Sequence, residues 1–154
     1  RRDRPRAGAD WGFLKKLRDE WKGNLIVKGV LDPEDARKIK DAGVDAVYVS
    51  GHGARQLDSL PAPITQLPKI RKAVGKSFPL IFDTGVRNGE DVVKAYASGA
   101  NFVMLGRPVL YALGADGERG LKTIMNYISK EIQVTLAQIG LSKISDVNET
   151  NLIR

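Results

Sequence analysis

The sequence predicts an α/β fold built on a parallel sheet, and three observations support this prediction. Short runs of apolar, mostly β-branched residues recur along the chain. Segments with helical periodicity and recognisable ends separate these runs. The strict alternation of strand and helix is typical of consecutive βαβ units. With 154 residues, 42% of them apolar, we expect a single core, in one domain or part of one.

Four apolar runs are predicted to be strands. Their apolar side chains do not alternate with polar ones, so we expect each strand to be buried on both faces of the sheet. The runs cover residues 25–27, 46–49, 79–82 and 102–105.

Helical segments precede, separate and follow these strands. The clearest begins after Asp32, which can cap it, has Pro33 at its first helical position and ends at Gly43. The others are expected over residues 10–21, 63–74 and 88–99, in a short segment from Gly106-Arg107-Pro108 onward, and in a long amphipathic segment over residues 115–139.

The sequence also repeats itself, which bears on the architecture. Glu34-Asp35 recurs as Glu90-Asp91, and Gly43 recurs as Gly99 at the same spacing. Such a repeat is expected if a pair of βα units were duplicated within a (β/α)8 barrel. An open, doubly wound sheet is the alternative, because it shares the same alternation of elements.

Charge and polarity divide the chain into three parts. The formal net charge is +7, and the first six residues contain four arginines and one aspartate. We therefore expect a basic flexible segment over residues 1–9, the folded domain over residues 10–140, and a polar C-terminal tail over residues 141–154 that leaves the core.

Composition excludes several classes of function. Cysteine is absent and His52 is the only histidine, so disulfide scaffolds, thiolate nucleophiles and Cys/His zinc sites are excluded, and we expect no metal. Aromatic residues are too few for a nucleic-acid surface, so no such partner is expected. No apolar run approaches the roughly 20 residues that span a membrane, and the chain opens with charged residues rather than a signal peptide. We expect a soluble cytoplasmic protein, either free or peripheral to a membrane.

Polar residues or glycine follow every predicted strand. They are Lys28, Ser50, Asp83 and Gly106. In parallel β/α barrels the residues just past the carboxyl ends of the strands line the site, so we expect these four to lie together. A buried lysine requires a negative partner, and for Lys28 this is either an ion-pair partner in the protein or bound negative charge.

The loop over residues 49–58, Val-Ser-Gly-His-Gly-Ala-Arg-Gln-Leu-Asp, is the most informative segment. Small residues on both sides of His52 let the backbone approach a planar ligand, and Arg55 can bind a carboxylate through two N–H groups. An imidazole beside a guanidinium suits proton abstraction from an anionic substrate. An isolated loop histidine is more often structural, but the position beside Arg55 at a strand end favours catalysis.

Gly106-Arg107-Pro108 predicts a phosphate site. It places backbone N–H groups at a helix start after the last strand, which is the usual location of such a site in barrels. Alone, this pattern would be an ordinary helix cap. Arg87, in the run Asp83-Thr84-Gly85-Val86-Arg87 one unit earlier, can reach the same phosphate and makes the prediction more specific.

Together these residues resemble the family of FMN-dependent 2-hydroxy-acid dehydrogenases and oxidases, which includes glycolate oxidase, L-lactate dehydrogenase and mandelate dehydrogenase. The family pattern reads K-G, S-N-H-G-G-R-Q-L-D, D-G-G-V-R and G-R-P, in this order and with similar spacing. The resemblance covers nearly all of residues 10–140 and is most specific at His52 and residues 55–58. It implies the C-terminal half, strands 5–8, of a TIM (β/α)8 barrel.

The resemblance implies FMN as cofactor and oxidation of an L-2-hydroxy acid, such as L-lactate or glycolate, to the 2-oxo acid. His52 would be the catalytic base, Arg55 would hold the substrate carboxylate, and Lys28 would stabilise the reduced flavin. The implied flavin contacts are Lys28, Ser50, Asp83, Thr84, Gly85, Val86, Arg87, Gly106 and Arg107. The implied partners are the hydroxy acid, an electron acceptor (oxygen, a quinone or a cytochrome) and the N-terminal half of the barrel, in a homotetramer when complete.

The sequence departs from the family pattern in three positions and in length. Gly51 replaces Asn, Ala54 replaces Gly and Thr84 replaces Gly, which changes hydrogen bonding in the histidine loop and adds a methyl group near the flavin. Because the amino-terminal half of the barrel is missing, we expect a fragment or one chain of a split barrel, weakly active at best alone. Two other classes stay open: another phosphate-binding barrel enzyme, such as an isomerase or IMP-dehydrogenase-like protein, and a non-catalytic module derived from the family.

Overall fold

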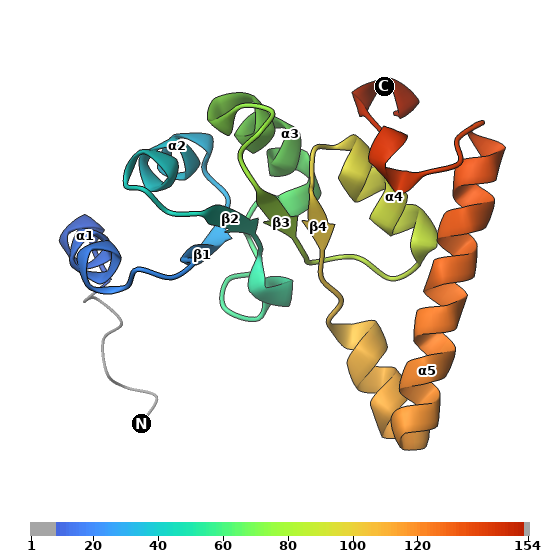
Figure 1. Cartoon of the computed structure of the whole chain (residues 1–154). Helices are drawn as coiled ribbons and strands as arrows, with labels where there is room; N and C mark the ends of the chain where they lie inside the picture. The colour runs from blue at the N-terminus through green and yellow to red at the C-terminus, as the bar shows by residue number, and fades with distance from the viewer. Residues whose placement is uncertain (1–8, 153–154) are drawn as a thin grey trace.

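Four parallel strands form one sheet in the order β1-β2-β3-β4 (Figure 1). The structure, a computed structural model, describes residues 9–152. The strands are β1 (Ile26–Val30), β2 (Ala46–Val49), β3 (Leu80–Phe82) and β4 (Phe102–Val103). Each strand pairs with the next along the chain, which confirms the predicted parallel βα alternation. β1 extends past its predicted end because Lys28 and Val30 still pair with β2.

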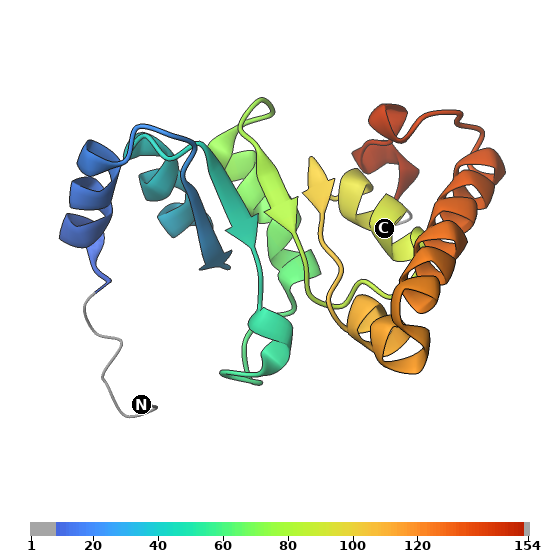
Figure 2. The same ribbon diagram turned by 60° about the horizontal axis from the view of Figure 1, so that its bottom comes forward.

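Helices cover one face of this sheet. α2 (Pro33–Asp41), α3 (Pro63–Val74) and α4 (Gly89–Ala97) lie along that face, and α1 (Trp11–Glu20) lies beside the edge at β1 (Figures 1 and 2). A doubly wound sheet would carry helices on both faces and reverse its strand order, so the described residues do not support that alternative.

Side-chain caps fix the starts of three helices, and the cap at Asp32 confirms the prediction. Asp32 accepts hydrogen bonds from two backbone N–H groups of the first turn of α2. Asn88 accepts one such hydrogen bond at the start of α4, and Asp10 accepts one at the start of α1. Each cap satisfies donors that the helix itself leaves without partners, which stabilises a helix by about 1 kcal/mol.

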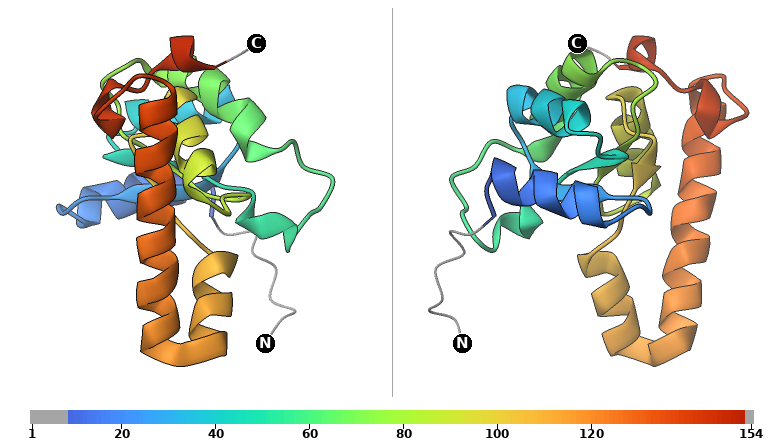
Figure 3. Two further views of the ribbon diagram at one scale, coloured as in Figure 1. Left: turned by 90° about the vertical axis from the view of Figure 1, so that its right-hand side faces the viewer. Right: turned by 60° about the vertical axis from the view of Figure 1, so that its left-hand side comes forward.

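The helix α5 (Arg107–Gln138) is two helical arms joined at a sharp reversal. Asp116 and Gly117 leave the helical conformation, and the long second arm runs back past the short first one (Figure 3). The sequence predicted these two segments. The long arm packs closely against the start of α4, where a Cβ on Gly89 would lie 2.5 Å from the backbone nitrogen of Ile132.

The two faces of the sheet differ in burial. Val47, Val49 and Leu80 are fully buried beneath the helices. On the opposite face, Ile26 is 48% and Phe102 56% exposed, and Figure 2 shows this face without a covering helix. The prediction that the strands are buried on both faces is therefore wrong for this face. The physical reason is that four strands do not close a barrel, so no strands of the described chain stand opposite.

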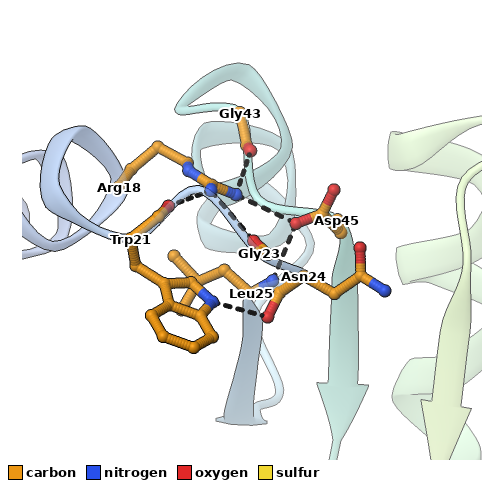
Figure 4. A network of polar contacts seen from close by, with 7 residues as sticks. All are labelled: Arg18, Trp21, Gly23, Asn24, Leu25, Gly43 and Asp45. Atoms are coloured by element: carbon orange, nitrogen blue, oxygen red, sulfur yellow. Dashed lines mark hydrogen bonds and ion pairs between the residues drawn. The ribbon is translucent and has the colours of Figure 1, made fainter.

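A polar network joins α1 to the amino ends of β1 and β2 (Figure 4). Nη1 of Arg18 donates to the carbonyl of Gly43 at 3.4 Å and to the carboxylate of Asp45 at 2.9 Å. The same carboxylate accepts the backbone N–H of Leu25 at 2.7 Å. This backbone hydrogen bond has the largest effect on the pKa of Asp45 and lowers it. Desolvation opposes this effect, and the hydrogen bond and charge of Arg18 lower the pKa further.

An equivalent network recurs one repeat later. Arg71 donates to the carbonyl of Gly99 through Nε at 2.9 Å and to Oδ1 of Asn101 at 2.6 Å. Asn101 Oδ1 in turn accepts the backbone N–H of Leu80 at 2.9 Å. Gly99 thus occupies the place of Gly43, so the sequence repeat is also a repeat of contacts.

The described part of the C-terminal tail, residues 141–152, returns to the core, which corrects the expectation that this tail leaves it. Residues 153–154 lie outside the described residues. Val147 is buried in a cluster with Val93 and Leu136, and Leu141 and Ile144 pack against that cluster. This part of the chain forms 3-10 turns at η2 (Ile144–Asp146) and η3 (Glu149–Asn151).

Two further expectations concern the chain ends and membranes. Residues 1–8 of the expected basic segment lie outside the described residues, and Ala9 is exposed. Within residues 9–152, none of the helices is long and apolar enough to cross a bilayer.

Candidate active site

A cleft of about 640 Å³ lies at the carboxyl ends of the strands. All of the predicted site residues except Ser50 line it, and Ser50 is buried. The lining residues are Lys28, His52, Gly53, Arg55, Gln56, Asp83, Thr84, Gly85, Val86, Arg87, Met104, Gly106, Arg107 and Leu110. The prediction that strand-end residues lie together is therefore confirmed by the geometry.

The cleft carries an excess of positive charge. Lys28, Arg55, Arg87 and Arg107 line it, against the single carboxylate of Asp83. Arg107 donates from Nη2 to the carbonyl of Gly53 at 2.7 Å. Within residues 9–152, the guanidinium groups of Arg55 and Arg87 form no hydrogen bond or ion pair. Two guanidinium groups without protein partners suit a ligand with more than one anionic group.

The loop after β2 presents His52 in a strained backbone. His52, Gly53 and Ala54 all have positive φ, at 53°, 67° and 62°, in the short turn η1 (His52–Ala54). For a residue with a Cβ this conformation costs roughly 1–2 kcal/mol. Ser50 supports the turn, because its Oγ accepts the N–H of His52 at 3.1 Å. Strain that is held by such contacts is typical of active sites.

Thr84 ties this loop to the end of β3. Its Oγ1 accepts the N–H of Gly51 at 3.1 Å and that of Gly53 at 3.4 Å. The same hydroxyl donates to Oδ1 of Asp83 at 2.8 Å. Thr84 has a φ of 75°, which a glycine would adopt without strain. The departures Gly51 and Thr84 are therefore neighbours in space, and the threonine hydroxyl supplies a contact to the histidine loop.

Lys28 and Asp83 form an ion pair in the wall of the cleft. Nζ of Lys28 lies 3.5 Å from Oδ2 of Asp83 and donates to Oγ of Ser50 at 3.1 Å. The expectation of a buried lysine is wrong, since 41% of this side chain is exposed on the open side of the sheet. Of the two partners considered for Lys28, an ion-pair partner in the protein is present.

Tyr48 contacts two residues that line the cleft, and sequence reasoning missed it. Its hydroxyl donates to Oδ2 of Asp83 at 2.8 Å, and the Nζ atom of Lys28 lies 4.6 Å from its ring centroid. Tyr48 lies inside a predicted apolar strand. Side chains two residues apart in a strand lie on the same face, so Tyr48 shares a face with Ser50. This spacing was the sequence signal that could have placed Tyr48 near the site.

Opposing effects set the pKa of Asp83. Burial raises it, but hydrogen bonds from Ser50, Tyr48 and Thr84 and the charge of Lys28 together outweigh burial, so the pKa lies below its ordinary value. Burial has the largest effect on the pKa of Tyr48 and raises it. The hydrogen bond to Asp83 and the negative charge of Asp83 raise it further. At neutral pH the carboxylate is therefore ionised and the phenol is a donor.

Gly29 fixes how closely the imidazole approaches β1. Gly29 has a φ of +96°, and a Cβ added there would lie 2.6 Å from Cε1 of His52. The ring of His52 therefore packs against the backbone just after Lys28. Only glycine permits both this backbone conformation and this contact.

Replacing Gly29 with alanine is expected to displace the His52 ring and to lower the free energy of unfolding by roughly 2 kcal/mol. Urea denaturation measures the stability, and the imidazole NMR resonances report the displacement. Gly75→Ala is the matched control, because Gly75 has a φ of +84° but no atom within 4 Å of an added Cβ. This variant should lose stability through backbone strain alone, and its imidazole resonances should be unchanged. Equal resonance shifts in both variants would contradict the packing argument.

The far end of the cleft can accept a phosphate. Gly85 and Gly106 border open space, since an added Cβ at either would meet no atom within 4 Å. Gly106 precedes α5 and provides no side-chain cap, so the helix start remains open to a ligand. Arg87 and Arg107 line the same cleft. The N–H groups of Gly106 and Arg107 at this helix start, together with the two guanidinium groups, form a donor set that suits a phosphate dianion.

A parallel β/α sheet with a cationic cleft at its carboxyl ends and an uncapped helix start after the last strand is typical of one class, the phosphate-binding β/α-barrel proteins. Within this class, the FMN-dependent dehydrogenase family matches residues 2–154. The chain belongs to this family. This match favours the FMN-dependent dehydrogenase family over the alternative of an isomerase or IMP-dehydrogenase-like barrel.

Relatives and solved structures agree with the family. The chain is 47% identical over 142 residues to an L-lactate dehydrogenase of Caulobacter vibrioides (strain NA1000 / CB15N), covering 92% of this chain and 37% of the relative. An (S)-mandelate dehydrogenase described as a monotopic membrane protein superposes with a TM-score of 0.91 at 41% identity, covering 96% of this chain and 39% of that one. A lactate oxidase of Pediococcus acidilactici superposes with a TM-score of 0.83 at 44% identity, covering 87% and 37%.

The chain thus spans little more than a third of the length of the relatives it matches. Its fold is that of part of a TIM barrel, as the sequence predicted.

Proposed function

We propose that this chain is the C-terminal half of an FMN-dependent barrel enzyme that oxidises an L-2-hydroxy acid to the 2-oxo acid. The observation that carries the proposal is that His52, Arg55 and the Gly106-Arg107 helix start share one cleft. L-Lactate and (S)-mandelate are the first substrates to test, because relatives named for these acids are 47% and 41% identical to the chain.

The residues present fit FMN. Arg87, Arg107, Gly85 and Gly106 would hold the phosphate, with the backbone of Val86 between them. In addition, Asp83, Thr84 and Lys28, which line the cleft, would face the remainder of the cofactor, and the buried Ser50 would act through its hydrogen bond with Lys28. When bound, FMN supplies the acceptor for the hydride that leaves the substrate carbon.

The chain's own catalytic groups are His52 and Arg55. Arg55 is exposed to the cleft and has no protein partner within residues 9–152, so its guanidinium is available for the substrate carboxylate. Nε2 or Nδ1 of His52 would take the proton of the substrate hydroxyl, since the imidazole makes no side-chain hydrogen bond with residues 9–152. Gly29 and Ser50 hold that ring and its loop in place.

The N-terminal half of the barrel is the proposed partner for the open face of the sheet. Ile26, Phe102 and Met104 lie exposed there or at the cleft, as the inner surface of a barrel would if opened. We further propose a homotetramer and an electron acceptor that is oxygen, a quinone or a cytochrome. A cytoplasmic location, free or peripheral to a membrane, completes the proposal, and the monotopic relative favours the peripheral form.

The proposal is tested on the complete protein encoded by the gene. We expect the visible absorbance of oxidised flavin and its bleaching when L-lactate or L-mandelate is added without oxygen. The D-enantiomers serve as the control and should not bleach it. Colour without bleaching by any 2-hydroxy acid would instead favour a non-catalytic module. A colourless protein that binds no added FMN would contradict the proposal altogether.

A further inference from the structure

Tyr48 joins the two charged groups that face the cleft from different strands. It lies on β2, where it pairs in register with Lys28 of β1 on one side and Ile81 of β3 on the other. Asp83 follows β3 just beyond Ile81. A single half-buried side chain therefore spans the distance between the cation and the carboxylate.

Both contacts of Tyr48 are well formed. The hydroxyl donates to Oδ2 of Asp83 at 2.8 Å, a normal length for such a bond. The face of the ring lies under the ammonium group of Lys28, 4.6 Å from Nζ to the centroid, within the range of a cation–π interaction.

The hydroxyl occupies the oxygen of Asp83 that Lys28 would otherwise approach. Nζ of Lys28 lies 3.5 Å from this Oδ2, whereas a charge-assisted hydrogen bond between such groups is about 2.7–2.9 Å long. The second oxygen, Oδ1, already accepts the hydroxyl of Thr84 at 2.8 Å. The carboxylate thus accepts neutral donors at both oxygens, while the lysine stays at a distance from it.

We propose that Tyr48 is a positioning residue that keeps Lys28 from closing onto Asp83, so that the positive charge of the lysine stays directed into the cleft. The inference rests on the proposed function, in which that charge acts on the bound flavin. A lysine fully paired with Asp83 would be partly neutralised and would stabilise a reduced, anionic ligand less.

Tyr48→Phe in the complete protein tests the inference, because phenylalanine keeps the ring beneath Lys28 and removes only the hydroxyl. A crystal structure of the flavin-free variant should show the Nζ–Oδ2 separation falling from 3.5 Å to about 2.8 Å. With FMN bound, the midpoint potential of the flavin should shift to a more negative value. Tyr127→Phe is the matched control, because Tyr127 lies exposed on α5, and it should change neither quantity.

The two readouts separate this inference from the proposed function. An unchanged Nζ–Oδ2 separation overturns the role of Tyr48 whether or not the protein binds flavin. A shortened separation with an unchanged potential overturns its effect on the cofactor. If the wild-type protein binds no FMN, the proposed function fails, and the separation in the crystal alone then decides whether Tyr48 holds Lys28 and Asp83 apart.

Discussion

Replacing His52 with glutamine is expected to reduce the rate of flavin reduction by an L-2-hydroxy acid by about 10²–10⁴-fold, while the flavin stays bound. Glutamine is similar in size and can hydrogen-bond, but it cannot take up a proton near neutral pH. The donors proposed for the phosphate, Arg87 and Arg107, are untouched. Stopped-flow absorbance of the complete protein, mixed with substrate without oxygen, measures the rate.

Ser59→Ala is the control for this experiment. Ser59 is exposed in the chain that follows the histidine loop and does not line the cleft, so the reduction rate should equal that of the wild type. A His52→Gln variant that reduces flavin at the wild-type rate would refute the role of His52 as base. A variant that loses the flavin would show that the imidazole supports the cofactor instead.

Replacing Arg71 with methionine is expected to lower the free energy of unfolding by about 3 kcal/mol. The guanidinium of Arg71 donates to the carbonyls of Gly75, Phe78 and Gly99, at 2.6, 2.7 and 2.7 Å respectively. Burial lowers the pKa of this arginine, as expected for a guanidinium enclosed by its acceptors. Methionine fills similar space but leaves these carbonyls without their donor. Urea denaturation followed by circular dichroism measures the change.

Arg37→Met is the matched control for Arg71. Arg37 is exposed on α2, and among residues 9–152 its ion-pair partner is Glu34, one helical turn away. An exposed pair of this kind contributes little, so the denaturation midpoint should not move measurably. Equal effects of the two substitutions would show that the Arg71 network does not hold the loops at the amino ends of the strands.

Much of the fold could be predicted because its signals are local. Asp32 and Asn88 cap helices through their own neighbours, and Gly43 ends α2 in the predicted place. The repeat of Gly43 as Gly99 predicted duplicated βα units, and the carbonyls of both glycines accept hydrogen bonds from arginine side chains. Strand burial was predicted less well, because an apolar run does not show whether the surface opposite belongs to the same chain.

The site was predictable to the extent that it depends on strand ends. Lys28, Asp83 and Gly106 could be placed together, since parallel strands deliver their last residues to one edge of a sheet. Tyr48 could not, because its importance comes from a hydrogen bond to a residue on the next strand. Likewise, no local sequence pattern predicts the hydrogen bond from Arg107 to the carbonyl of Gly53.

The sequence alone determined the order of elements, the helix ends and the residues at the mouth of the sheet, because backbone preferences and periodicity act over a few neighbouring positions. Only the tertiary structure decided that one sheet face lies open and that Val147 returns to the core. It also decided that Tyr48 contacts both Lys28 and Asp83. Each of these depends on the packing of segments distant in sequence, whose mutual orientation no short pattern encodes.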